Sequence, residues 1–114
     1  MAKGKNLGDF EQLVILAVMR LGEGAYGMAV RREIEANAGR SVSLGAIYAT
    51  LDRLEEKGLV SSAQGNPTPQ RRGRAKRFFR AEALGVRALQ ESLAALDRLR
   101  RGIKELDDPI GAET

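Results

Sequence analysis

Six basic side chains lie within the ten residues from 71 to 80, and no acidic residue interrupts them. They are Arg71, Arg72, Arg74, Lys76, Arg77 and Arg80. The rest of the chain carries 13 basic and 15 acidic residues, so this segment holds the whole excess behind the net charge of +4. Because like charges at this density repel one another, the cluster favours a polyanionic partner. Double-stranded DNA fits best, and an anionic membrane surface or a solubilising loop are the alternatives.

The 114-residue chain contains no cysteine and no histidine. This composition excludes disulfide scaffolds, zinc fingers, thiol nucleophiles and histidine-based triads. No glycine-rich phosphate loop matches a nucleotide-binding motif, and no clustered carboxylates offer a metal site. We therefore expect a protein that is not an enzyme, with no catalytic residue, cofactor or metal.

The longest apolar run, residues 13–19, is seven residues long. A membrane-spanning helix needs roughly 20 residues, so no membrane span is expected. Residues 1–7 lack the apolar run of a signal peptide. The length fits one compact domain, and the absence of cysteine suits a reducing compartment. We expect a cytoplasmic protein that does not bind membranes.

Apolar spacing predicts three helices before the basic segment and one long helix after it. Asp9 and Ser43 are the expected N-caps of the first and third helices, and Gly39 and Gly58 end the second and third. Two short strands enclose the basic loop and form a hairpin, with Phe78 and Phe79 on opposite faces. The expected elements are helices at 9–21, 26–38, 44–57 and 82–106 and strands at 59–64 and 76–80.

This order of elements is typical of a winged helix-turn-helix followed by a long C-terminal helix. The predicted fold class is thus mainly α with a small β-hairpin. The third helix would enter the major groove, and the basic hairpin, or wing, would follow the phosphates beside it. We expect a DNA-binding domain at 7–81, a dimerisation helix at 82–106 and a frayed tail at 107–114.

The first helix is apolar on two faces, and the last carries apolar residues seven apart in two offset series, interrupted by Ser92. This pattern favours association of two subunits, and packing within one domain is the alternative. The candidate dimerisation residues are Phe10, Leu13, Ile15, Leu16, Met19, Leu89, Leu93, Leu96, Leu99, Ile103 and Leu106.

The outward residues of the third helix are mostly small, and Gly45 would allow close approach either to DNA or to a neighbouring helix. Tyr48 would contact a phosphate or pack on the hairpin. Arg53 would read a base or pair with neighbours on its own helix. The candidate DNA-binding residues are Ser43, Gly45, Ala46, Tyr48, Ala49, Thr50, Arg53, Arg71, Arg72, Arg74, Lys76 and Arg77.

Three stretches of the chain resemble the PadR family of bacterial transcriptional regulators. The stretch SLGAIYATLDRLEEKGLV is similar to the family's recognition helix and first wing strand, although Ala49 replaces the usual proline. The other two resemble the first two helices and the returning wing strand, and read GDFEQLVILAVMRLGEGAYGMAVRREIE and GRAKRFFRAEALG.

The resemblance implies a winged-helix homodimer that usually acts as a repressor on a pseudo-palindromic operator. It implies that the last helix packs against the partner's first helix, and that Tyr48 occupies the family's tyrosine position. It leaves room for a small-molecule inducer, whose identity the sequence does not give. A non-specific or architectural DNA-binding protein is the main alternative, because the outward face of the third helix is poor in base-reading side chains. A protein-interaction module built on the last helix is a further one.

Overall fold

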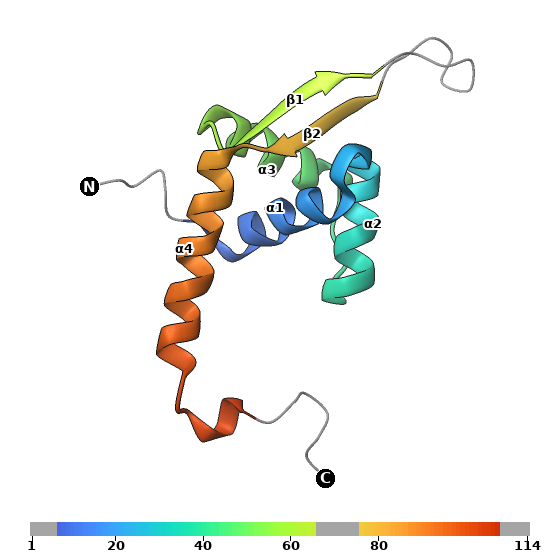
Figure 1. Cartoon of the computed structure of the whole chain (residues 1–114). Helices are drawn as coiled ribbons and strands as arrows, with labels where there is room; N and C mark the ends of the chain where they lie inside the picture. Colours follow the sequence, from blue (N-terminus) through green and yellow to red (C-terminus); the bar gives the residue numbers. More distant parts are fainter. Residues whose placement is uncertain (1–6, 66–75, 108–114) are drawn as a thin grey trace.

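A computed structural model describes residues 7–65 and 76–107 of the chain. It confirms the predicted order of elements and the mainly helical fold with one antiparallel hairpin. Figure 1 shows the first three helices grouped together, the hairpin along one side and the last helix extending away from them. The elements are α1 (Asp9–Leu21), η2 (Gly22–Gly24), α2 (Gly27–Ala38), α3 (Leu44–Glu56), β1 (Val60–Gln64), β2 (Arg77–Ala81), α4 (Ala83–Arg100) and η4 (Lys104–Leu106).

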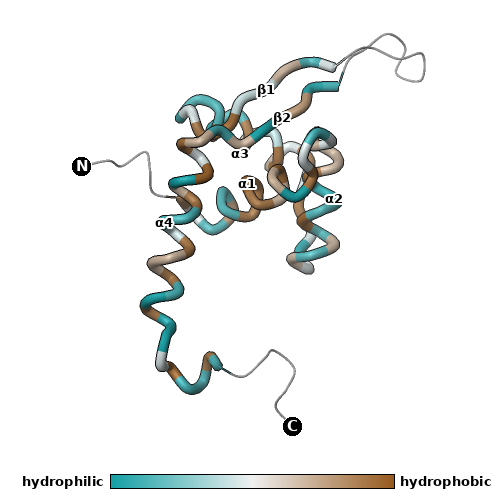
Figure 2. The backbone as a smooth tube through the Cα atoms, in the orientation of Figure 1, coloured by the Kyte–Doolittle hydropathy of each residue, from teal (hydrophilic) through white to brown (hydrophobic). Residues whose placement is uncertain are grey.

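Helix α1 lies at the centre of the core, and Val14, Ile15 and Val18 are completely or almost completely buried. It contacts α2, α3, β2 and the start of α4. Figure 2 shows hydrophobic stretches along α1, which runs between α4 and α2. Full burial of such a side chain stabilises the fold by about 1.5–3 kcal/mol, so α1 organises the domain.

The helix ends follow local chemistry, with one correction. Ser43 caps α3, because its Oγ accepts the amide N–H of Ala46 at 3.0 Å. Gly39 ends α2 in the left-handed region, with φ of 64°. The prediction that Asp9 caps α1 is wrong, since Gly8 is the N-cap and its N–H donates to Glu11 Oε1 at 3.0 Å. The carboxylate of Glu11 therefore does the capping from within the helix.

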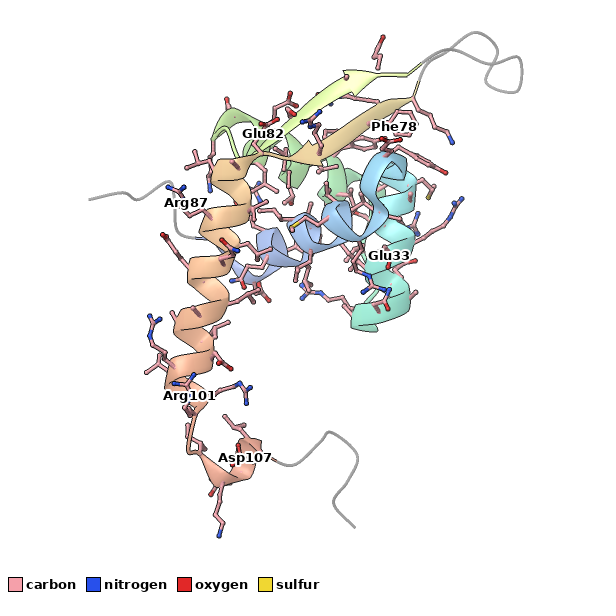
Figure 3. The ribbon with its side chains drawn as sticks, in the orientation of Figure 1. Glu33, Phe78, Glu82, Arg87, Arg101 and Asp107 are labelled. Atoms are coloured by element: carbon pink, nitrogen blue, oxygen red, sulfur yellow. The ribbon has the colours of Figure 1, made fainter. Side chains whose placement is uncertain are left out.

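The hairpin pairs Val60 with Ala81 and Gln64 with Arg77, so each strand begins one residue later than predicted. Phe79 is buried, and its N–H donates to the carbonyl of Ala25 at 2.8 Å. Phe78 lies on the other face near the start of α2 (Figure 3). The two phenylalanines thus divide between core and flank as predicted, and the hairpin is attached to the link between α1 and α2.

Helix α4 is packed at its start and exposed along its second half. Gly85, Ala88 and Leu89 are buried, and a Cβ at Gly85 would overlap the backbone carbonyl of Leu59. The predicted extension of this helix to residue 106 is wrong, because α4 ends at Arg100 and Gly102 adopts φ of 84°. The backbone leaves the helical region at Arg101, with ψ of 132°, and the left-handed Gly102 follows, so the helix ends before the last predicted heptad.

Candidate nucleic-acid interface

The first turns of α3 present small residues to solvent. Gly45, Ala46 and Ala49 are exposed, as is the capping Ser43. Among the residues that the structure describes, a Cβ at Gly45 would meet only Ser43 Oγ, at 4.0 Å, so none of the described helices requires a glycine there. The close-packing explanation for Gly45 is therefore wrong, and approach to an external partner remains the prediction.

Thr50 is only 2% exposed, which corrects the prediction that it reads base edges. It lies three residues after Ile47 and four before Leu54, so helical geometry turns it towards the core. Its hydroxyl accepts a hydrogen bond from Arg53 Nη2 at 3.3 Å. Thr50 thus supports Arg53 from inside the domain.

Tyr48 is half-buried on the flank of α3. Its ring centroid lies 6.5 Å from that of Phe79, and its ring covers Gly27 at the start of α2 so closely that a Cβ there would overlap it. Packing on the hairpin is therefore part of its role. The same packing restrains the position of the Tyr48 phenol. A contact between this phenol and a phosphate remains a prediction.

Arg53 and Lys57 share the carboxylate of Glu11 on α1. Glu11 Oε2 accepts from Lys57 Nζ at 3.1 Å and from Arg53 Nε at 3.3 Å. Burial raises the pKa of Glu11, but the N–H of Gly8 and the two cations outweigh burial and hold that pKa below its usual value. Sequence reasoning missed Glu11, although an acid three and four residues before the apolar Val14 and Ile15 of a core helix was a signal for it. The ion-pair partner of Arg53 is thus Glu11 on α1, outside the helix that carries Arg53.

The wing cations fall into two groups. Arg71, Arg72 and Arg74 lie outside the described residues. Lys76 and Arg77 both have partners within the chain. Lys76 Nζ lies 3.7 Å from the ring centroid of Tyr26. Lys76, joined by Arg32, lowers the pKa of the Tyr26 phenol, and burial opposes this only in part.

Arg77 bridges the hairpin to α3. Its Nη2 lies 2.7 Å from Glu55 Oε1 and 3.1 Å from Asp52 Oδ1, and its Nε donates to Ser62 Oγ at 3.1 Å. Burial lowers the pKa of Arg77, but the hydrogen bonds to Glu55 and Asp52 outweigh it and raise that pKa. With two carboxylates beside it, Arg77 contributes little free positive charge for a phosphate.

Large apolar side chains are exposed on α1 and on α4. Met19, Leu93, Leu96 and Leu99 are 44%, 41%, 56% and 79% exposed. Ile103 and Leu106 are also exposed, but they follow the break at Gly102.

The other candidate dimerisation residues pack on the chain's own core. Ile15 and Leu89 are buried there, so the prediction that they contact a partner is corrected. Phe10, Leu13 and Leu16 are partly buried against the same core.

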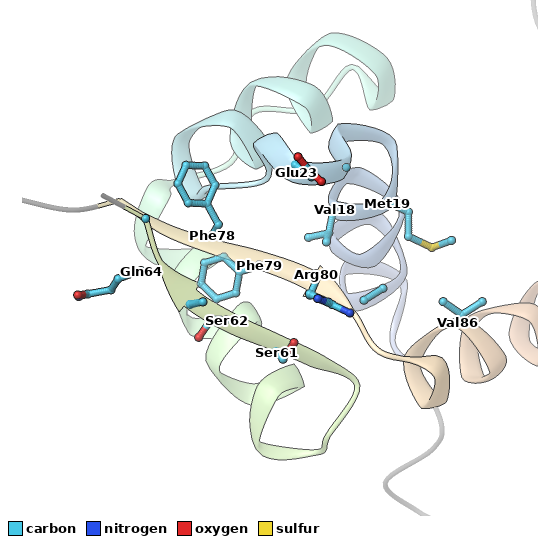
Figure 4. Close-up of a pocket in the computed structure, with 14 residues that line it drawn as sticks. Val18, Met19, Glu23, Ser61, Ser62, Gln64, Phe78, Phe79, Arg80 and Val86 are labelled. Carbon is cyan, nitrogen blue, oxygen red and sulfur yellow. The ribbon is translucent and has the colours of Figure 1, made fainter. Parts of the chain in front are cut away.

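A cleft of about 790 Å³ opens between the end of α1, the hairpin and the start of α4 (Figure 4). Val18, Met19 and Val86 contribute apolar surface, and Ser61 and Arg80 contribute polar groups. No residue of α3 lines it, so the cleft lies away from α3, although it shares the hairpin with the candidate interface. Across residues 7–65 and 76–107, no three acidic, cysteine or histidine side chains gather as a metal site. In that same part of the chain, no helix has both the length and the hydropathy of a membrane span.

Comparison with known proteins decides what kind of protein carries these surfaces. Residues 15–91 match the transcriptional regulator PadR-like family. The chain belongs to this family. It is 43% identical over 78 residues to transcriptional regulator Rv3488 of Mycobacterium tuberculosis (strain ATCC 25618 / H37Rv), covering 68% of each protein.

Two solved PadR structures show the same fold. The regulator from Eggerthella lenta DSM 2243 superposes with a TM-score of 0.65 at 29% identity, covering 85% of this chain and 82% of that one. The regulator from Clostridium difficile R20291 superposes with a TM-score of 0.64 at 17% identity, covering 87% and 99%. This PadR-like chain is therefore a DNA-binding transcriptional regulator with a winged helix, and the expectation that it is not an enzyme is confirmed.

Proposed function

We propose that this PadR-like protein is a sequence-specific repressor that binds a pseudo-palindromic operator as a homodimer in the cytoplasm. The observation that carries the proposal is the uncovered outer face of α3, with Gly45, Ala46 and Ala49 exposed beside the hairpin. A helix of this kind fits the major groove, and the segment joining the strands contains Arg71, Arg72 and Arg74 for the phosphates. A dimer bound across a promoter would exclude the polymerase, which is the basis for repression.

The exposed leucines of α4 support the dimer. Leu93, Leu96 and Leu99 recur every three residues along a half-helix that extends beyond the winged helix (Figure 1). Full burial of an exposed side chain of this size contributes about 1.5–3 kcal/mol, and each leucine would gain the share that corresponds to its remaining exposed area. Two copies joined in this way would present two α3 helices to two half-sites. Any small-molecule inducer would act by changing the spacing between those helices.

Specificity in this proposal comes largely from geometry. Arg53 is half-exposed, but Glu11 and Thr50 already engage it. One arginine–guanine pair is worth roughly 1–3 kcal/mol of discrimination. Two per dimer reach only the lower part of the roughly 4–10 kcal/mol that separates specific from non-specific binding. Half-site spacing and DNA shape must supply the remainder.

The test compares a spacing change with a side-chain change on a duplex selected from a random library. Inserting about five base pairs between half-sites turns one onto the opposite face of the duplex, and should abolish specific binding. Arg53→Ala should relax preference at one position per half-site, and Arg87→Ala, on an exposed site of α4, is the matched control. Tolerance of the insertion together with complete loss of discrimination in Arg53→Ala would contradict the proposal.

The architectural alternative remains a specific competitor, because small side chains dominate the first turns of α3. A non-specific protein would bind scrambled and selected duplexes with equal affinity at the same salt concentration. The spacing experiment separates the two, since an architectural protein has no half-sites to misalign.

A further inference from the structure

The stripe of α3 that begins with Gly45 and Ala49 continues with Asp52 and Glu56, because these residues recur every three or four positions. Asp52 is the first of them with a side chain that can hydrogen-bond. Its side chain is 59% exposed. A carboxylate here needs a reason, since it lies on the surface proposed to approach phosphates, where a negative charge is unfavourable.

Asp52 is held from the hairpin. Arg77 Nη2 lies 3.1 Å from Asp52 Oδ1, and the same guanidinium is fixed by Glu55 at 2.7 Å and by Ser62 at 3.1 Å. Ser62 Oγ also donates to Glu55 Oε2 at 2.9 Å, which closes the network. Arg77 engages one oxygen of Asp52, and a carboxylate has lone pairs for further donors. The carboxylate is therefore restrained and still able to accept another hydrogen bond.

The major groove offers few donors to such an acceptor. Guanine presents N7 and O6 and thymine presents O4, all of which are acceptors and repel a carboxylate. Adenine has an N6 amino donor beside its N7 acceptor. Cytosine presents the N4 amino donor alone, so it is the base that a carboxylate favours.

We propose that Asp52 is a specificity-determining residue that accepts a hydrogen bond from the N4 amino group of one cytosine in each half-site, with Arg77 as its positioning residue. This inference rests on the proposed function, since it requires α3 in the major groove. Asp52 contributes to specificity in two ways. It gains a hydrogen bond at cytosine, and elsewhere its charge repels phosphates and base acceptors, which weakens binding to wrong sequences.

The first experiment selects binding sites from a random duplex library with the unaltered chain, Asp52→Ala and Glu56→Ala. Both variants remove one exposed negative charge from α3, so both should bind scrambled DNA more tightly. Only Asp52→Ala should lose a cytosine from each selected half-site. Equal selected sequences for all three proteins would overturn the inference.

The second experiment changes the DNA and leaves the protein intact. Each cytosine of the selected site is replaced in turn by 2-pyrimidinone, which lacks the N4 amino group. At one position per half-site the unaltered chain should lose about 10- to 150-fold in affinity, the range for one hydrogen bond to a charged group. For Asp52→Ala, replacing any one cytosine should lower the affinity by about the same factor, with no position that stands out. Sensitivity that persists in Asp52→Ala would contradict the assignment.

The positioning role of Arg77 is tested by measuring the same preference for cytosine. Arg77→Gln should broaden selection at that cytosine position more than at any other, and Arg77→Lys should restore part of it. A purely structural role would weaken binding to all sequences equally. If the unaltered chain selects no sequence, the proposed function fails and this inference fails with it. If it selects a site without cytosine dependence, only the role of Asp52 is overturned.

Discussion

The outer face of α3 and the second half of α4 are both uncovered, but they expose opposite kinds of surface. The α3 face presents Gly45, Ala46 and Ala49, followed by the charged Asp52 and Arg53. The α4 half-helix presents three leucines, up to 79% exposed at Leu99. Water solvates the first surface well, whereas the second is an apolar stripe of the kind that marks interaction sites. Their difference favours a hydrated partner for α3 and an apolar partner for α4.

Binding through the two surfaces should therefore depend differently on salt concentration. Binding to DNA releases counterions and weakens as salt rises. Association through leucines removes apolar area from water and is not weakened by screening. The predictions below use this contrast, beginning with the change of largest expected effect.

Replacing Leu96 and Leu99 with Asp should convert the protein to monomers in sedimentation velocity. Both side chains are exposed in the single chain, so the fold should survive, as checked by circular dichroism. Loss of the second half-site contact should lower operator affinity by about 100-fold or more. Arg98→Asp is the matched control, because it adds a carboxylate about two residues from Leu96, on nearly the opposite side of α4. A double variant that stays dimeric would contradict the role of α4.

Replacing Arg71, Arg72 and Arg74 with Ala should weaken binding to selected and scrambled duplexes alike. Each phosphate contact contributes about 0.9 to the slope of log affinity against log salt on duplex DNA. Three lost contacts per subunit would flatten that slope by up to about 5 in a dimer. Affinity titrations at four salt concentrations measure it, and sedimentation should show an unchanged dimer. An unchanged slope would show that these arginines do not contact DNA.

Two glycine substitutions compare a tightly packed glycine, Gly85, with an exposed one, Gly45. Gly85→Ala should destabilise the fold by about 1–3 kcal/mol, since its Cβ would overlap the carbonyl of Leu59, a rigid backbone group. In the described part of the chain, a Cβ at Gly45 would make only an ordinary contact with Ser43 Oγ at 4.0 Å, so Gly45→Ala should stabilise α3 by up to about 1 kcal/mol. Urea unfolding measures both. If α3 approaches DNA closely at this point, Gly45→Ala should also lower operator affinity despite the greater stability.

Glu11→Gln should cost about 1–2 kcal/mol of stability near neutral pH, because a charged acceptor of hydrogen bonds is lost. The pKa of Glu11 is lowered by folding, so its contribution is complete above the unfolded value of 4.5 and disappears as pH falls through the folded value. The stability curves of the two proteins should therefore converge in acid. Urea unfolding between pH 3 and pH 7 tests this, and parallel curves would contradict it.

The sequence predicted what depends on local pattern. The cap at Ser43, the boundaries of α1 and the division of Phe78 and Phe79 all follow from periodicity and turn chemistry. It did not predict pairs that meet only after folding, such as Glu11 with Arg53 or Asp52 with Arg77, since their partners are 42 and 25 residues apart.

Two errors in the predicted site have physical causes. Thr50 is polar and was therefore placed outside, yet its position between Ile47 and Leu54 turns it inward, where Arg53 satisfies its hydroxyl. The heptad pattern of the last helix predicts continuity to residue 106, but the backbone becomes extended at Arg101 and left-handed at Gly102, which ends the helix. For Thr50 the position along the helix outweighed the polarity of the side chain. For the last helix the backbone conformation after Arg100 outweighed the apolar repeat.

Hydroxyl-radical footprinting of the unaltered chain on a selected duplex tests the central claim most directly. The claim is that two copies, joined through α4, place two α3 helices in successive major grooves. It predicts two protected clusters related by a two-fold axis, with centres about one helical turn, or a whole number of turns, apart. Continuous protection without that symmetry, equal on selected and scrambled duplexes, would contradict it.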